Sequence, residues 1–190
     1  LHLCDRRQRQ MCIRDSHKML EQFAIGSLHI SAGIGVFHGK YPLSVCAREV
    51  DLLEQSAKGF VKGDKQKNAV CLFDENNTYD WDTFIRFVLG EKLQTLDAFL
   101  ENQEERGMAF LCRLLELIRH REEKINLARF AYVLTRLEPK ENKEEYQKFS
   151  RKMYQWACDD EGSQDSQQLI TAIYIYVYLH REEDERHDTE

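Results

Sequence analysis

The sequence predicts an α+β protein in which a small strand–helix–strand element precedes an all-α helical bundle. Three observations lead to this fold class: apolar residues alternate strictly over residues 28–37, they follow helical spacing from residue 81 onward, and the 190 residues include only two prolines and nine glycines. Hydrophobic residues make up 42% of the chain and charged residues 32%, which is an ordinary globular balance.

The first strand is expected over residues 28–37, where LHISAGIGVF alternates between larger apolar side chains and a face that carries Ser31 and two glycines. Glycine inside a strand often marks the close approach of another backbone or of a ligand. An amphipathic helix is expected over residues 43–58, followed by a polar, lysine-rich loop and a short buried strand over residues 69–73. This order is typical of a sheet covered by helices.

Beyond the second strand, only helices are expected. Asp80 suits the N-cap of the first helix, which should begin at Trp81 and bury Phe84, Ile85 and Val88. The apolar spacing predicts five later helices, over residues 93–101, 105–119, 124–137, 146–157 and 168–179.

Residues 1–16, LHLCDRRQRQMCIRDS, follow neither helical nor strand periodicity and lack the apolar segment of a secretory signal. They resemble translated sequencing-adapter sequence, so we interpret them as a non-native leader. The alternative is a basic, disordered arm that binds nucleic acid.

We place the domain boundary near residues 76–79, which gives a first domain over residues 17–75 and a helical domain over residues 80–190.

The formal net charge of −6 is unevenly distributed. Residues 1–16 carry +2, residues 17–75 are neutral, and residues 76–190 carry −8. Because an acidic surface does not attract phosphate through its bulk field, any affinity for nucleic acid must come from local basic sites.

The six cysteines form no Cys-x-x-Cys pair, so neither zinc nor a disulfide framework is expected. No apolar run is long enough to span a membrane, and the expected location is cytoplasmic.

Several short motifs occur in order along the chain: HISAGIGVFHGKYP, a helix end Ala-Lys-Gly, the strand KNAVCLF, the helix start WDTF, LARFAYVLTRLEP and QLITAIYIYVYLHR. Together, over about residues 17–181, they resemble the C-terminal part of the large subunit of type III-A (Csm-type) CRISPR effector complexes. The resemblance implies a partial ferredoxin-like palm element of the cyclase and diguanylate-synthase type, with residues 17–75 as the C-terminal half of the second palm domain. A helical C-terminal domain then follows.

The resemblance also implies a function. In that family the subunit binds ATP on paired palm domains when the complex engages target RNA and joins it into cyclic oligoadenylates, and a nuclease module cleaves single-stranded DNA in antiviral defence. Divalent metal, Mg or Mn, assists the phosphoryl transfer. The implied partners are the other subunits of the complex, especially the small helical subunit, together with crRNA and target RNA. The implied location is the prokaryotic cytoplasm.

No catalytic residue is assigned in this chain. The family's metal-binding aspartates sit in a Gly-Gly-Asp-Asp hairpin, which the sequence lacks and which the resemblance places upstream of His17. Asp159 and Asp160 are adjacent, but they lie at an expected helix end without glycines and fit a solvated surface. Whether the chain is an enzyme stays open, because the resemblance implies an active intact subunit whereas we expect this fragment alone to be inactive.

Nucleotide binding is assigned to Lys58, Ser31 and Lys62. Lys58 matches the lysine at the end of the palm helix that reaches nucleotide phosphates in related domains; the alternative is an ordinary cation favoured at a helix C-terminus. Ser31 can meet a nucleotide or bond a neighbouring backbone. Lys62, with Lys65 and Lys67, forms a basic loop that can contact phosphate or simply be solvated.

Two other functions remain open. One is a docking module that contributes only helical surface to an RNA-guided assembly, and the other is a diguanylate-cyclase-like signalling domain, which the acidic helical part disfavours.

His29 and His38 have no partners at the spacing of a nucleophilic triad. Core or interface packing, and not base stacking, is expected of the large aromatic residues of the helices, Trp81, Trp156, Tyr174, Tyr176 and Tyr178.

Overall fold

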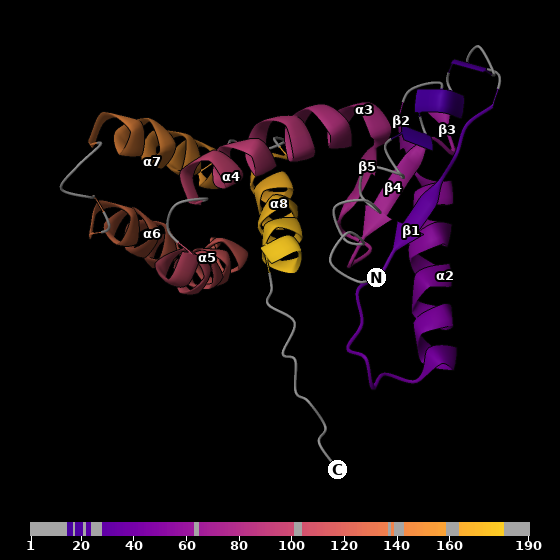
Figure 1. The fold of residues 1–190 in the computed structure, drawn as a ribbon, viewed down its shortest axis with the longest axis horizontal. Coiled ribbons are helices and arrows are strands. Elements are labelled where there is room, and N and C mark those ends of the chain that lie inside the picture. The colour runs from indigo at the N-terminus through magenta and orange to yellow at the C-terminus, as the bar shows by residue number, and fades with distance from the viewer. Residues whose placement is uncertain are drawn as a thin grey trace.

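The computed structural model describes residues 15–16, 18–20, 22–23, 28–62, 65–100, 104–136, 138, 143–158 and 164–180, without the side chains of residues 62, 65–66 and 104–107. Within these ranges a small mixed sheet and one helix lie at one end of the molecule and a bundle of helices lies at the other (Figure 1). The predicted α+β class is therefore confirmed.

The sheet has three strands, β1 (Ala32–Ile34), β4 (Ala69–Leu72) and β5 (Thr78–Asp80), in the order β1-β4-β5. β1 and β4 run parallel, with Ala32 opposite Val70, and β4 and β5 run antiparallel. The parallel pair is joined through the helix α2 (Leu43–Gly59), as a parallel connection requires. A second, two-stranded hairpin of β2 (Val61–Lys62) and β3 (Lys65–Gln66) follows α2.

The rest of the described chain is helical. Asp80 caps α3 (Trp81–Thr83), since its Oδ2 accepts a hydrogen bond from the Thr83 backbone N–H at 3.2 Å, as the sequence predicts. The helix continues as a π-helix, η1 (Phe84–Leu93), and then as α4 (Gln94–Leu100). The remaining helices are α5 (Glu104–Arg119), α6 (Lys124–Arg136), α7 (Lys143–Ala157) and α8 (Asp165–His180).

The sheet lies between α2 on one face and the helical bundle on the other, as Figure 1 shows. Because side chains alternate along a strand, Val70 and Leu72 of β4 face the large core of the bundle, whereas Ala69 and Cys71 face α2. The core on the α2 side is small and includes Leu53, Ala57, Ala69 and Cys71. The core on the bundle side continues from the sheet through η1 to α8.

The predictions of individual elements were wrong at several places. The strand expected over residues 28–37 is regular only at β1, and the polar loop after α2 contains the β2–β3 hairpin. β5 was missed, because its three residues are too few to show periodicity and are fixed by pairing with β4. α7 and α8 begin three residues earlier than predicted, in polar segments that apolar spacing cannot detect. The division into residues 17–75 and 80–190 stays a prediction.

Candidate functional site

The predicted nucleotide-binding residues lie toward one end of the β1–α2 layer. A Cβ atom added at Gly35 would lie 3.2 Å from Val50 Cγ2, and one added at Gly33 would lie 2.5 Å from the Glu54 backbone N. Two residues of β1 thus extend along about four residues of α2, which runs antiparallel to it. This agrees with a rise of about 3.3 Å per residue in a strand and about 1.5 Å per residue in a helix. Ser31 lies two residues before Gly33, on the side of β1 that leads toward the C-terminal end of α2.

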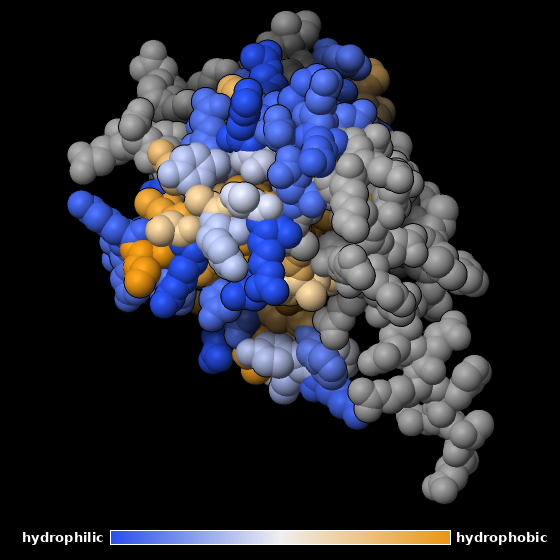
Figure 2. Space-filling view, turned by 90° about the vertical axis from the view of Figure 1, so that its left-hand side faces the viewer, coloured by the Kyte–Doolittle hydropathy of each residue, from blue (hydrophilic) through white to orange (hydrophobic). Residues whose placement is uncertain are grey.

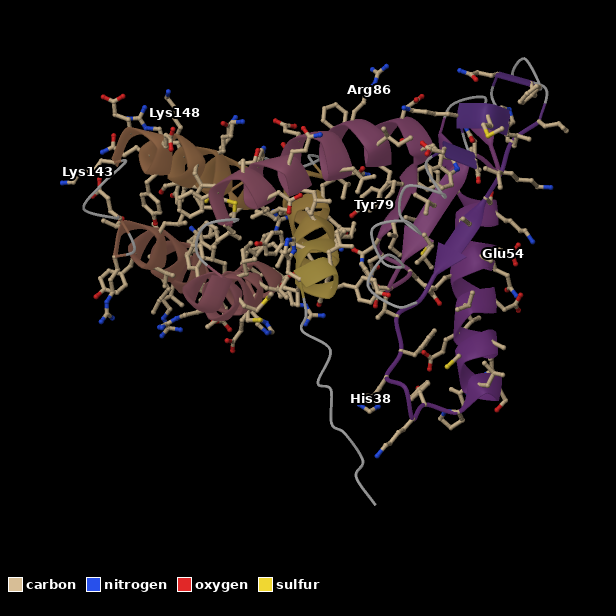
Figure 3. All side chains as sticks on the ribbon, viewed as in Figure 1. His38, Glu54, Tyr79, Arg86, Lys143 and Lys148 are labelled. Atoms are coloured by element: carbon tan, nitrogen blue, oxygen red, sulfur yellow. The ribbon has the colours of Figure 1, made fainter. Side chains whose placement is uncertain are left out.

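Lys58 lies in the last turn of α2, with its side chain 52% exposed. Its Nζ is 2.8 Å from Oε1 of Glu54, one turn earlier on the same helix (Figure 3 labels Glu54). Exposed pairs at this spacing contribute only about 0.3–0.5 kcal/mol. The ammonium can therefore leave Glu54 for a stronger anion at little cost, which is the behaviour required of a phosphate contact.

Ser31 directly precedes β1, and its Oγ is buried without a hydrogen-bond partner among the described residues. A buried hydroxyl usually has a partner, because an unsatisfied one costs about 1–3 kcal/mol. A buried hydroxyl without a partner among the described residues is consistent with either interpretation made from the sequence, a nucleotide contact or a backbone contact.

The lysines after α2 are only partly described. Lys62 lies in β2, opposite Lys65 of β3, and the side chains of both lie outside the described residues. Lys67 is exposed and has a positive φ of 59°, so it turns the chain from the hairpin into β4. The hairpin follows α2 directly and lies near its C-terminal end in Figure 1, so the backbone of Lys62 is at the same end of the layer as Lys58.

The other residues named in the sequence analysis are mainly buried aromatic residues of the core or exposed histidines. Trp81 and Trp156 are buried, at 1% and 5% exposure, and Tyr176 is buried as well, which confirms core packing for these three. Tyr174 and Tyr178 are half-buried. His29 and His38 are exposed, and Nδ1 of His38 accepts a 3.3 Å hydrogen bond from the Lys40 N–H. The pair at residues 159–160 lies outside the described residues.

Metal binding does not fit the described residues. No group of three or more His, Cys, Asp or Glu side chains in these parts of the chain is placed to hold an ion. Lys58, by contrast, offers a cation suited to a phosphate group. The described residues therefore offer a cation for an anionic group and do not by themselves form a site for Mg or Mn.

Sequence reasoning missed a buried polar network between β5 and α8. The hydroxyls of Tyr79 and Thr171 lie 2.8 Å apart, and Asn77 Oδ1 accepts hydrogen bonds from Thr171 Oγ1 at 3.2 Å and from Gln167 Nε2. Burial raises the pKa of Tyr79 to about 12, although the bond to Thr171 acts in the opposite direction. The sequence carries no signal for these pairs, because their members are about 90 residues apart.

Two comparisons with known proteins bear on this architecture. Residues 97–182, which comprise most of the helical part, match the family model of the second helical domain of the CRISPR RNA silencing complex Cmr2 subunit. The chain is also 42% identical, over 164 residues, to a single-strand-specific deoxyribonuclease of subtype III-A CRISPR systems, Cas10/Csm1, from Mycobacterium tuberculosis. That alignment covers 86% of this chain and 19% of the relative.

The chain belongs to the Cas10/Csm1 family of subtype III-A. Cas10/Csm1 proteins of Streptococcus thermophilus and Enterococcus italicus are each 36% identical to it, over 156 and 167 residues. These alignments cover 80% and 88% of the chain, and 20% of each relative. The chain thus corresponds to a fragment of the large subunit and spans about a fifth of the length of the curated relatives it matches.

The surface of this Cas10/Csm1 fragment is mainly hydrophilic on the side of the bundle that faces the viewer in Figure 2. Small hydrophobic areas interrupt it. Among the helices described, none is both long and apolar enough to cross a membrane.

Proposed function

We propose that this chain contributes part of a nucleotide-binding palm, with its helical domain, to the large subunit of a type III-A CRISPR complex. The subunit would bind ATP, join it into cyclic oligoadenylates when the complex engages target RNA, and cleave single-stranded DNA. The observation that carries this proposal is the 42% identity over 164 residues to a Cas10/Csm1 deoxyribonuclease. The name of that relative supports the nuclease activity of an intact subunit, and the palm resemblance supports the nucleotide chemistry.

The part of this chain in the proposed chemistry is to hold a nucleotide. Lys58 would contact a phosphate group with its exposed ammonium, which only a weak pair with Glu54 holds in place. Ser31, which directly precedes β1, would offer a buried hydroxyl, and Lys62 would add a second cation. The metal-binding aspartates and the nuclease residues would come from parts of the subunit that this chain does not contain.

A docking module is the second candidate. It is favoured by two exposed apolar side chains on α6, Ile125 at 55% and Tyr132 at 62% exposure. They are seven residues apart and therefore share one face of the helix. In this alternative the helical domain would bind a neighbouring subunit of the complex, the small helical subunit above all, and the palm element would serve only as its support.

The replacement Lys58→Ala, made in the assembled complex, tests the nucleotide proposal. We expect ATP affinity to fall about tenfold to hundredfold, because a charged hydrogen bond to a phosphate contributes roughly 1.5–3 kcal/mol. Oligoadenylate formation should fall in parallel, whereas assembly of the complex should be unchanged. Equilibrium binding of labelled ATP and size-exclusion chromatography measure the two effects.

Two control variants make the result specific. Glu54→Gln removes the ion pair but keeps the cation, so it should leave ATP affinity unchanged or slightly higher. Lys143→Ala removes an exposed lysine from α7, at the far end of the molecule in Figure 3, and should have no effect. If Lys58→Ala binds ATP as the unmodified complex does, Lys58 serves only the helix and the docking module becomes the better proposal.

A further inference from the structure

A cleft of about 790 Å³ lies between α8 and the turn that joins β4 to β5. Its walls come from four parts of the chain: the segment after β1, the β4–β5 turn, the end of α5 and one face of α8. Phe73, Asn77, Arg119, His120, Tyr174 and Tyr178 are among the residues that line it. We call it the turn cleft, and Tyr79, labelled in Figure 3, marks the strand beside it. Its size is within the range of small-molecule binding sites.

The backbone is strained where the β4–β5 turn meets the turn cleft. Phe73 has a φ of +63°, which is rare for a bulky side chain. On either side of Phe73, the Asp74 N–H donates a hydrogen bond to the Leu72 carbonyl at 2.7 Å. This bond closes a γ-turn of the rare type in which the central residue has a positive φ. The Phe73 N–H in turn donates to the Ile34 carbonyl at 2.9 Å. Such strain persists only where the surroundings impose it, and it is concentrated at functional sites.

Aromatic rings and one cation line the other side of the turn cleft. The Phe73 ring packs against Tyr174 with ring centroids 5.6 Å apart, and the Arg119 guanidinium lies 5.5 Å from the Tyr174 centroid. Tyr178 follows Tyr174 by one helical turn on the same face of α8. Arg119 is exposed and ends α5, so its N–H groups also face solvent at the mouth of the cleft.

The polar groups of the turn are held in place by neighbours. Asp74 Oδ1 accepts hydrogen bonds from the backbone N–H of Asn76 at 2.9 Å and from its side-chain Nδ2 at 2.7 Å. Asn77 is 2% exposed and is bonded to Thr171 and Gln167 of α8. The carboxylate of Asp74 is therefore engaged within the turn, and hydrogen bonds tie the turn to α8, which carries Tyr174.

We propose that the turn cleft binds one nucleotide of a single-stranded RNA. The base stacks on the aromatic wall of Tyr174 and Phe73, a role that the sequence did not lead us to expect of Tyr174, and the adjoining phosphate binds the guanidinium of Arg119. This ligand fits because aromatic side chains beside an arginine recognise a base and its phosphate together, independently of base identity. It also provides the local basic site that nucleic-acid binding requires in an acidic helical domain.

Fluorescence anisotropy with a fluorescein-labelled ten-nucleotide oligoadenylate RNA, titrated with the full 190-residue chain, tests this proposal. Arg119→Ala and Tyr174→Leu should each weaken binding about fivefold to hundredfold, the range expected for the loss of one stacked base. Arg119→Ala should also reduce the slope of log affinity against log salt by about 0.7, because one phosphate contact on a single strand is lost. A purely structural arginine would not change that slope.

Matched variants separate the cleft from general effects. Arg136→Ala removes an exposed arginine that likewise ends a helix, α6, and should bind as the unmodified chain does. Tyr174→Phe keeps the ring and should retain binding within about twofold. The palm proposal is tested separately, through the ATP affinity of the complex that carries Lys58→Ala, so failure here is distinct from failure of the palm proposal.

The unmodified chain must bind the RNA saturably, and Arg119→Ala must weaken that binding. Because Arg119 is exposed, its variant should fold even if Tyr174→Leu does not, which circular dichroism verifies for each protein. Binding that is undetectable in the unmodified chain, or unchanged in Arg119→Ala, overturns the proposal. Either result would leave the turn cleft to a protein segment of the complex.

Discussion

At the scale of single residues, Lys92 shows how tertiary contacts define the environment of a side chain. Its side chain is fully buried at the junction of η1, α7 and α8. Nζ donates to Asp165 Oδ1 at 2.7 Å and to Gln168 Oε1 at 2.9 Å, and lies 5.0 Å from the centroid of Trp156. In the sequence it is an ordinary helical lysine, and only the approach of α8 from 73 residues away surrounds it.

The variant Lys92→Met should lower the free energy of unfolding by about 2–4 kcal/mol. Methionine fills the space, but Gln168 Oε1 loses a buried donor and Asp165 loses its cation. Because the Asp165 side chain is 41% exposed, water offsets part of its loss. Urea denaturation measures the difference.

Lys152→Met is the matched control, because Lys152 also lies over the Trp156 ring, at 5.9 Å, but is exposed. This variant should change stability by less than about 1 kcal/mol. Equal effects of the two substitutions would show that the contact with Trp156, and not burial of the charge, accounts for the stability.

At the scale of elements, the strand β1 and the helix α2 show what a sequence pattern can predict. The alternation around residues 28–37 indicated a small face on which another backbone or a ligand comes close. The structure identifies that neighbour at Gly33 as the backbone of α2. The pattern thus predicted the close approach correctly but not its partner, since α2 reaches this face only through the crossover connection.

Gly33→Ala should destabilise the protein by about 1–3 kcal/mol, the usual cost of overpacking. Its Cβ would lie 2.5 Å from the Glu54 N and 2.9 Å from the Leu53 carbonyl carbon and the Val50 carbonyl oxygen, and backbone atoms cannot rotate away. Gly39→Ala, whose Cβ would meet nothing within 4 Å, is the control. Thermal denaturation measures both variants. Equal melting temperatures for Gly33→Ala and Gly39→Ala would contradict the close packing of β1 against α2.

The π-helix η1 could not be predicted from spacing. Its buried residues Phe84, Val88 and Lys92 recur every four residues and Leu93 follows Lys92 directly, so the inner face has a longer period than the 3.6 residues of an α-helix. Gly90 lies within it, where an added Cβ would be 3.0 Å from the Ile85 carbonyl oxygen. Apolar spacing predicts a helix here and places Ile85 on its inner face; Ile85 is half-buried and packs against the core, whereas Phe84 and Val88 are fully buried.

At the scale of the whole molecule, the sheet and the helical bundle share one hydrophobic core. Val70 and Leu72 of β4 belong to the same buried cluster as the inner residues of α5 to α8. Polar contacts reinforce this union: the Trp81 indole N–H donates to the Ile30 carbonyl at 2.8 Å, and Tyr79 bonds Thr171 of α8. Separate unfolding of either part would expose this shared surface.

We therefore expect the described parts of the chain to unfold in a single cooperative transition. In a Trp156→Phe variant, fluorescence reports on Trp81 beside the sheet, while circular dichroism at 222 nm reports mainly on the helices. The two midpoints should coincide in urea. Midpoints separated by more than about 0.5 M would show that the sheet and the bundle are independent units.

The sequence by itself determined the fold class, the order and approximate extent of the longer helices, the cap at Asp80 and the family, because these depend on local periodicity and on motifs within short windows. Only the tertiary structure decided the buried environment of Lys92, the strand β5, the π-helix, the partner of Gly33 and the assembly of the turn cleft. The physical reason is that each of these depends on contacts between residues distant in the chain, which local spacing does not encode. The candidate site lies between these cases: the family motif indicated Lys58, whereas the burial of the Ser31 hydroxyl became visible only in the structure.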